Sequence, residues 1–393
     1  MSAALRHVSS DAAARSDSVQ VKIAFVVHDY HRAGGHSRYV AELANRFSRT
    51  HEVHVFANTI EPDAAEIHFH HVPAWRLNAL TTIFTFILPA TRLLDGGFDI
   101  VHAQGLCSLN YDVLTAHICN RAWYQARRET RTAVGWKERV VDRLFDSLVS
   151  PVEKWLYRSS TAAPVIAISE VTRRNLSKFY RREAGVSVIH HGVDGSLFKP
   201  ANRRLYRTEV RAQLGLAESE FVFLFVGNLR KGALFAIQAL QHLKEGKLLL
   251  VSPTPPNDYE RAVGQLGLKG RVIFCSPTET IERYYAAADA FVFPSPYEDF
   301  GMVISEAMAS GLPVITGREA GAAELIEHGR EGFLLENPAD AEEIAGYLRR
   351  LMTEPELGRA FGLAAREKTE SYTWDAVAER TMDVYRQVLA ARR

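Results

Sequence analysis

Two glutamates separated by seven residues, Glu298 and Glu306, are the side chains in this sequence best placed to do chemistry. A carboxylate can accept hydrogen bonds from both hydroxyls of a vicinal diol. Between the two lies a predicted helix start at Gly301, whose free N–H groups attract phosphate. The five helical steps from Gly301 to Glu306 would rise about 7.5 Å. The stretch therefore offers a diol acceptor, an anion site and a second diol acceptor, in the order of the hexose, diphosphate and ribose of a nucleotide sugar.

The elements around these glutamates predict a strand, a loop, a helix and a second strand. The apolar run 290–293 is short enough for a buried strand, and Pro294 and Pro296 stop it. Gly311 and Pro313 end the helix that follows. Isolated acids with this spacing are usually solvated residues at a helix start. The proline loop, the glycine and the flanking strands favour a binding site instead.

This stretch resembles the signature of the retaining GT-B glycosyltransferases of family four, also called group 1, which include bacterial cell-envelope and lipopolysaccharide enzymes. The resemblance implies that Glu298 holds the donor sugar and that Glu306 holds the ribose. It also implies donor contacts from the residues between them: Phe300, Gly301, Met302 and Val303.

A second anion site is predicted where the strand 221–226 enters the loop 227–232, which contains two adjacent cations. The resemblance implies that Lys231 stabilises the donor diphosphate and that Gly227 and Asn228 lie beside it. Family members usually carry an arginine where this chain has Asn228, so we expect Arg230 to supply the second charge. The alternative is a pair of solvated cations at a turn.

The N-terminal half opens with a strand, a loop containing Gly34 and Gly35, and a helix. Paired glycines allow a ligand to approach the backbone closely, and the resemblance places this pair beside the donor phosphates and the acceptor. It also implies that His117, at a strand end, lies beside the reacting anomeric carbon, where it would position and polarise. The alternative is a core histidine. His191 stands where family members have asparagine.

Strands alternating with helices along both halves predict an α/β protein of GT-B fold, with two Rossmann-like domains facing across a cleft. We expect a disordered tail over residues 1–18, an acceptor-binding domain over 19–197 and a nucleotide-sugar domain over 198–371. The amphipathic segment 372–393 is expected to return to the first domain as a helix.

Composition excludes several classes of function. The net charge is +1, divided as +5 in residues 1–200 and −4 in residues 201–393, and no nucleic-acid module is present. Three cysteines without a CxxC pattern and the lack of a signal peptide predict a reduced, cytoplasmic chain. His68, His70 and His71 suggest a metal cluster, but no carboxylate or cysteine spacing supports one. No D-x-D motif occurs, so we expect neither a bound metal nor another cofactor.

Two segments of the N-terminal half suggest contact with an anionic membrane surface. Residues 77–94 are unusually apolar, and residues 121–139 carry six basic and two acidic side chains with Trp123, Tyr124 and Trp136 among them. The alternatives are a packed helix for the first and a solvated helix for the second. Peripheral attachment to the cytoplasmic face of the membrane is the sharper hypothesis.

The function expected from the resemblance is retaining transfer of a hexose from a nucleoside diphosphate sugar, with UDP-hexose favoured, to a glycan or lipid-linked acceptor. His117, Lys231, Arg230 and Glu298 are the expected catalytic residues. Two alternatives remain: a sugar-nucleotide epimerase of the same architecture, and a non-catalytic membrane-associated scaffold.

Overall fold

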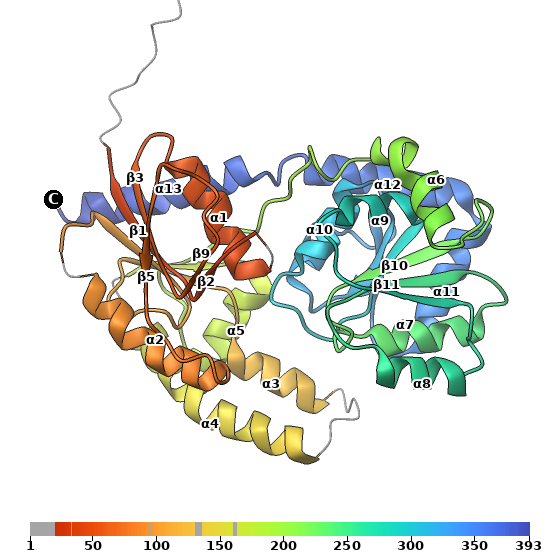
Figure 1. Cartoon of the computed structure of the whole chain (residues 1–393), viewed down its shortest axis with the longest axis horizontal. Coiled ribbons are helices and arrows are strands. Elements are labelled where there is room, and N and C mark those ends of the chain that lie inside the picture. Colours follow the sequence, from red (N-terminus) through yellow and green to blue (C-terminus); the bar gives the residue numbers. More distant parts are fainter. Residues whose placement is uncertain (1–19, 33, 95, 130–135, 160–162) are drawn as a thin grey trace, which may run out of the picture.

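The computed structural model describes residues 20–32, 34–94, 96–129, 136–159 and 163–393. It contains two parallel β-sheets, each with helices on both faces, and the predicted α/β class with two Rossmann-like units is confirmed (Figure 1). The expected tail over residues 1–18 lies outside the described residues.

The first sheet has seven strands in the order β5-β3-β1-β6-β7-β8-β9, all parallel. Because the chain starts in the middle and runs outward in both directions, the order reverses between β1 and β6. Ligands of such sheets bind at this reversal. The strands are β1 (Lys22–Val26), β3 (Glu52–Ala57), β5 (Ile67–His71), β6 (Ile100–Gln104), β7 (Val113–Ala116), β8 (Val165–Ala167) and β9 (Val186–Val188). A separate pair joins β2 (Asp29–Tyr30) to β4 (Thr59–Ile60).

The second sheet has six parallel strands in the order β12-β11-β10-β13-β14-β15, and it reverses between β10 and β13. Its central strands are almost wholly apolar and buried, as expected for strands covered on both faces. The strands are β10 (Val222–Val226), β11 (Lys247–Val251), β12 (Val272–Cys275), β13 (Ala290–Phe293), β14 (Val314–Gly317) and β15 (Gly332–Leu335).

Alternate residues of β1 point to opposite layers of the first domain. Ile23 and Phe25 pack with α1 (Gly35–Phe47), whereas Ala24 and Val26 pack with α2 (Ala79–Leu93). The other helices are α3 (Asn120–Glu129), α4 (Trp136–Ser159), α5 (Glu170–Tyr180), α6 (Asn202–Gln213), α7 (Ala233–Ala239), α8 (Asn257–Gln265), α9 (Ile281–Ala287), α10 (Met302–Ala309), α11 (Ala341–Thr353), α12 (Pro355–Thr369) and α13 (Trp374–Ala391).

The last helix, α13, leaves the second domain and packs against α1 of the first, along the edge seen in blue (Figure 1). Trp374 and Tyr385 are fully buried in the first domain's core. The Tyr385 hydroxyl also lies 2.6 Å from Nδ1 of His102, which is on β6. Residues from both ends of the chain therefore complete one core.

The basic segment 121–139 is described only in part. α3 ends at Glu129 and α4 begins at Trp136, while residues 130–135 and the side chain of Trp136 lie outside the described residues. Tyr124 is buried, and Trp123 carries the guanidinium of Arg127 over its ring at 4.6 Å. These two aromatic side chains are therefore used within the protein rather than displayed as an exposed aromatic surface.

Candidate active site

A cavity of about 420 Å³ lies between the two domains, at the reversal points of both sheets. It brings together residues from the first domain and from the second. Eleven of the thirteen side chains or backbone positions singled out in the sequence line it: Gly34, Gly35, His117, Gly227, Lys231, Glu298, Phe300, Gly301, Met302, Val303 and Glu306. Asn228 and Arg230 do not line it, and both are exposed on the loop after β10.

Lys231 and Glu298 meet at the second domain's side of the cavity. The Lys231 ammonium lies 2.7 Å from one carboxylate oxygen of Glu298 and 2.9 Å from the other. Gly232, with a φ of 98°, permits this approach, since a Cβ at that position would lie 2.1 Å from the carbonyl oxygen of Pro294. The loops that follow β10 and β13 therefore meet at their backbones, and this contact brings Lys231 beside Glu298.

The backbone of Glu298 is fixed by the loop after β14. Its N–H donates to Glu319 O at 3.1 Å, and its carbonyl accepts from Gly321 N at 2.9 Å. Gly301 then turns the chain into α10 with a φ of 89°, a left-handed conformation that favours glycine. No side chain caps α10, so its first N–H groups face the cavity without an intrahelical acceptor.

Glu306 joins the two domains. Its Oε1 accepts from Nη1 of Arg38, on α1, at 2.7 Å, and its Oε2 accepts from the Tyr285 hydroxyl at 3.1 Å. Burial raises the pKa of the Glu306 carboxyl, while the Arg38 charge opposes that rise. Arg38 also lines the cavity. Glu306, which is expected to accept hydrogen bonds from the ribose diol, is therefore paired with an arginine in this structure.

His117 follows β7 and forms the first domain's wall of the cavity. Its Nε2 lies 2.8 Å from Gln104 Oε1, an acceptor, so Nε2 carries the hydrogen and Nδ1 is left as an acceptor. Nδ1 is buried and has no hydrogen-bond partner among the described residues. Burial, followed by the neighbouring His36 and His191, holds the pKa of His117 well below its usual range. A neutral imidazole with a free acceptor atom suits hydrogen bonding to a sugar hydroxyl.

Asp299 is a further acid of the cavity, and its position links the domains. Its Oδ1 accepts from the Tyr297 hydroxyl at 2.7 Å and from the backbone N–H of Cys119 at 3.1 Å. Burial raises its pKa to about 7, with the Glu298 charge adding to the rise and the hydrogen bond from Tyr297 opposing it. Burial therefore favours the neutral form of Asp299 more than it does for an exposed aspartate.

A smaller cavity of about 290 Å³ adjoins the first and shares Gly34, Gly35 and His36 with it. It extends along the end of β1, where polar groups predominate. Nε2 of His28 is buried there without a hydrogen-bond partner in the described structure, and Nδ1 lies 3.2 Å from Cys107 Sγ. The remaining lining residues are Val27, Asp29, Ser37 and Gln104.

Sequence reasoning missed Arg38 and Asp299. Arg38 lies three residues beyond the Gly34–Gly35 pair, one helical turn into α1, so that spacing was the available signal. Asp299 is adjacent to Glu298, but nothing in the sequence distinguishes it from a solvated acidic residue of the loop. The other lining residues that were not singled out are Arg32, His36, Ile118, Trp123, Ile168, Val226, Phe293 and Tyr297.

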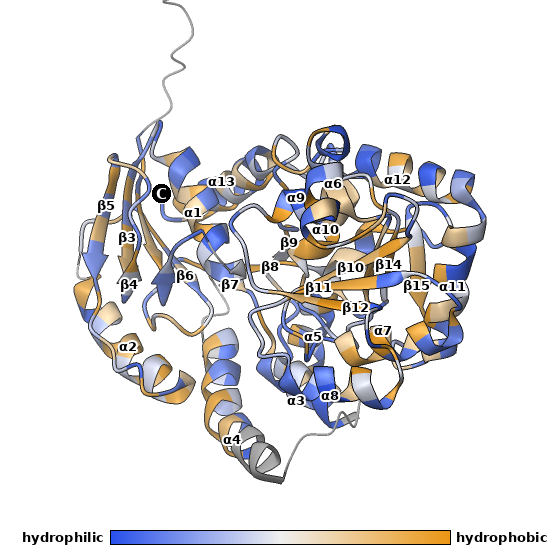
Figure 2. Ribbon diagram, turned by 45° about the vertical axis from the view of Figure 1, so that its right-hand side comes forward, coloured by the Kyte–Doolittle hydropathy of each residue, from blue (hydrophilic) through white to orange (hydrophobic). Residues whose placement is uncertain are grey.

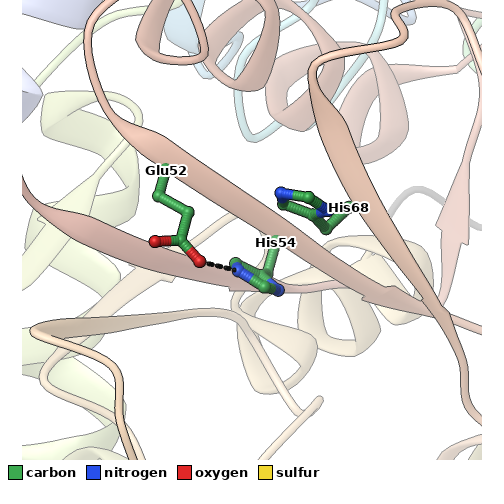
Figure 3. A group of neighbouring side chains, drawn as sticks. All are labelled: Glu52, His54 and His68. Atoms are coloured by element: carbon green, nitrogen blue, oxygen red, sulfur yellow. Dashed lines mark hydrogen bonds and ion pairs between the residues drawn. The ribbon is translucent and has the colours of Figure 1, made fainter.

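A group of imidazoles lies outside the cavity, on β3 and β5, where sequence spacing offered no carboxylate (Figure 3). The structure adds Glu52 and His54 from β3 beside His68, with potential ligand atoms within 4.8 Å of one another. His54 uses both nitrogens, at 2.8 Å to Glu52 and 2.8 Å to His70, and Lys22 lies 2.9 Å from the Glu52 carboxylate. An ion would have to displace these contacts.

Comparison with known proteins identifies the class. The two-domain fold is that of the GT-B glycosyltransferases: WaaG, a glycosyltransferase involved in lipopolysaccharide biosynthesis, superposes with a TM-score of 0.77 at 21% identity, covering 92% of this chain and 99% of that one. Anabaena HepE, whose structure was solved in complex with UDP-glucose, superposes with a TM-score of 0.69 at 20% identity, covering 94% and 100%.

The family is identified from sequence. Residues 33–197 match the family described as Glycosyltransferase Family 4, and residues 220–354 match Glycosyl transferases group 1. Both matched families consist of glycosyltransferases, so the chain is a glycosyltransferase of the group 1, family four type, as the resemblance implied. It is 27% identical to the D-inositol 3-phosphate glycosyltransferase of Xylanimonas cellulosilytica over 92% of this chain and 93% of that protein. It is 25% identical to spore coat protein SA of Bacillus subtilis over 90% and 95%.

Proposed function

We propose that this glycosyltransferase transfers a hexose, with retention of anomeric configuration, from a nucleoside diphosphate sugar to a glycan or glycolipid. One observation carries the proposal. Glu298, the uncapped start of α10 and Glu306 line one wall of a single cavity, in the order of the sugar, diphosphate and ribose of a donor. UDP-hexose is the favoured donor, in keeping with HepE, which binds UDP-glucose.

The leaving diphosphate would be stabilised by Lys231 and by the first N–H groups of α10. Negative charge develops on the diphosphate as the glycosidic bond breaks, and fixed cations and N–H groups stabilise that charge most strongly in the transition state. These groups supply the charge stabilisation that a bound divalent metal provides in other transferases. We therefore propose a reaction that needs no divalent metal.

Retention is proposed to occur by front-face attack. The acceptor oxygen forms its bond to the anomeric carbon on the face from which the diphosphate departs, and its proton passes to the departing phosphate oxygen. A double displacement would need a free carboxylate as nucleophile. Of the carboxylates lining the described cavity, Glu298 and Glu306 are assigned to donor hydroxyls, and Asp299 is held by the Tyr297 hydroxyl and the Cys119 N–H, which disfavours that role. His117 would orient a sugar hydroxyl.

The acceptor is proposed to enter through the smaller cavity. It adjoins the proposed donor site at Gly34, Gly35 and His36, and Nε2 of His28 is an unpaired polar atom in its described lining that suits a hydroxylated acceptor. A polyol or sugar moiety would bring its hydroxyl to the anomeric carbon from the first domain's side.

We propose that the protein acts while bound to a membrane surface. α2 and α4 expose large apolar side chains, and both helices appear with orange faces on the lower edge of the first domain (Figure 2). Four exposed basic residues accompany them, and the pairing of amphipathic helices with cations is typical of interfacial binding. No helix in the described ranges has the length and apolarity to cross a bilayer. The residues of this α2/α4 face are Phe84, Leu88, Arg92, Leu93, Arg143, Leu144, Leu148, Lys154, Trp155 and Arg158.

The test of the function is a panel of nucleotide sugars with different bases and hexoses, incubated with the protein without acceptor. We expect slow hydrolysis of one UDP-hexose and release of UDP, with the free hexose formed first as the α-anomer from an α-linked donor. Release of the inverted anomer would contradict retention. An altered sugar still attached to the nucleotide would indicate an epimerase.

A further inference from the structure

We infer that Arg38 is a donor-binding residue that exchanges Glu306 for the donor diphosphate when the nucleotide sugar enters. This inference rests on the proposed function, because it assigns a partner to a charge of the same site. It also places a residue of the first domain on the donor, although the glutamates and the lysine come from the second.

The cavity has few cations for a diphosphate. Its described lining contains Arg32, Arg38 and Lys231 as basic side chains. Asn228 stands where the resembled family carries an arginine, and Arg230 lies outside the lining. Arg32 is 67% exposed and is paired with Asp63 at 3.0 Å. Arg38, at 18% exposure, is therefore the enclosed cation available to complement Lys231.

Arg38 and a bound ribose compete for the Glu306 carboxylate. Its Oε1 accepts from Arg38 at 2.7 Å and its Oε2 accepts from Tyr285 at 3.1 Å. A vicinal diol donates to both oxygens, and Arg38 lines the same cavity, so in the proposed exchange the diol takes the place of Arg38 at Oε1. Arg38 then keeps one long ion pair, 3.9 Å from its Nε to Glu42, which is a weak contact for an enclosed cation. The donor itself supplies the compensating anion.

The diphosphate would lie within reach of the released side chain. Glu306 is four residues along α10 from Met302, a rise of about 6 Å, and the proposed phosphate site is the start of that helix. An arginine side chain can swing over such a distance from a fixed backbone. Its planar fork binds two phosphate oxygens at once, which a lysine cannot do.

Exchange predicts that a nucleoside and its diphosphate respond differently to Arg38→Met. The nucleoside no longer has to displace an arginine from Glu306, so it should bind more tightly. The nucleoside diphosphate also no longer has to displace the arginine, but its phosphates lose a charged partner. The ratio of nucleoside Kd to nucleoside diphosphate Kd should therefore fall about ten- to hundredfold.

Calorimetry on the full chain tests this, with uridine and UDP as probes and with the nucleoside and diphosphate of the panel's best donor. Arg173→Met is the matched control, because Arg173 is in the same domain, pairs with Glu170 at 2.6 Å and lies off the cavity lining. Arg38→Lys keeps the charge but lacks the planar fork of arginine, so it should give an intermediate ratio. It provides the measurement should Arg38→Met fold poorly.

An unchanged ratio, with both affinities shifted by one common factor, would overturn the exchange and leave Arg38 as a contact between domains. A nucleoside that binds more weakly to Arg38→Met would overturn it as well. Failure of every nucleoside diphosphate to bind the unmodified protein is a different result, because it would remove the proposed function itself.

Discussion

The ammonium of Lys231 and the carboxylate of Glu298 lie 2.7 Å apart, so the cation proposed for the diphosphate and the acid proposed for the sugar neutralise one another. The pair is half-open to the cavity, with the lysine side chain 42% exposed and the glutamate 16% exposed. A donor inserted at this place can draw the lysine toward phosphate and free the carboxylate for sugar hydroxyls. Ion pairs of this exposure are weak, so their separation costs little.

Replacing Lys231 with alanine should lower kcat by about a hundredfold or more, with a smaller change in KM, because the cation matters most when charge develops on the leaving diphosphate. Steady-state kinetics with the panel's best donor measures both constants. Lys247→Ala, at the opposite end of the second sheet and paired with Glu220, is the control and should leave both unchanged. A raised KM with an intact kcat would contradict a role in the chemical step.

Removing the Glu306 carboxylate in Glu306→Ala should weaken donor binding by roughly 1.5–3 kcal/mol, since the ribose loses a charged hydrogen-bond acceptor. Calorimetric titration with the donor nucleotide measures this loss. Glu336→Ala, which removes an exposed acid paired with Arg318 in the same domain, should bind normally. Unchanged affinity in a folded Glu306→Ala protein would rule out the ribose contact.

Activity should survive the removal of divalent metal. Lys231 and the N–H groups of α10 are proposed to meet the diphosphate charge, so dialysis against EDTA should leave kcat within about twofold of its initial value. The assay is UDP release from the best donor and acceptor pair. Complete loss in EDTA with recovery in Mg²⁺ or Mn²⁺ would reverse the proposal.

A buried acid outside the cavity lining should shape the pH dependence of stability. Burial raises the pKa of Glu153 to about 8, against hydrogen bonds from Tyr180 and Asn120. A raised acid pKa gives stability that is complete below about 4.5 and is lost as pH rises to about 8, at up to about 1.4 kcal/mol per pH unit. Glu153→Gln should flatten this slope and melt above the unmodified protein at pH 8.

The measurement is a series of thermal melts between pH 5 and pH 8. The difference between Glu153→Gln and the unmodified protein should change steadily in the variant's favour as pH rises. A difference that is constant across the series would show that Glu153 does not titrate in this window. Glu183→Gln, an exposed acid in the same domain, provides the control.

Docking through the α2/α4 face should depend on its apolar side chains. Leu88 and Trp155 are 54% and 53% exposed, and changing both to serine should move the protein from anionic liposomes to the supernatant in co-sedimentation. Leu363→Ser, on α12 of the second domain and 72% exposed, is the control that should still sediment. Binding should also fall with salt, as expected for cations near anionic lipid. Equal recovery of every variant in the supernatant would favour a soluble acceptor.

The fold could be predicted because most strands of the two large sheets are local runs rich in apolar residues. β13 spans the predicted residues 290–293, and α10 begins directly after Gly301 as expected. Proximity within the motif could also be predicted, since Glu298, Gly301 and Glu306 share one turn and one helix. The class followed from these local patterns, and it is confirmed.

Contacts between distant segments could not be predicted in this way. Arg38 and Glu306 are 268 residues apart, and nothing local to either one names the other. The sequence also could not predict which of the adjacent cations Arg230 and Lys231 lines the cavity. That depends on how Gly232, the next residue, packs against the Pro294 carbonyl.

The return of α13 to the first domain has a consequence for how the chain is made and divided. A ribosome releases β1 and α1 long before Trp374 and Tyr385, so the core of the first domain stays incomplete until α13 has been made. The gene therefore cannot be cut at residue 198 into two self-sufficient halves. A hybrid that takes its acceptor domain from a relative has to take that relative's last helix too, in two separate pieces of sequence.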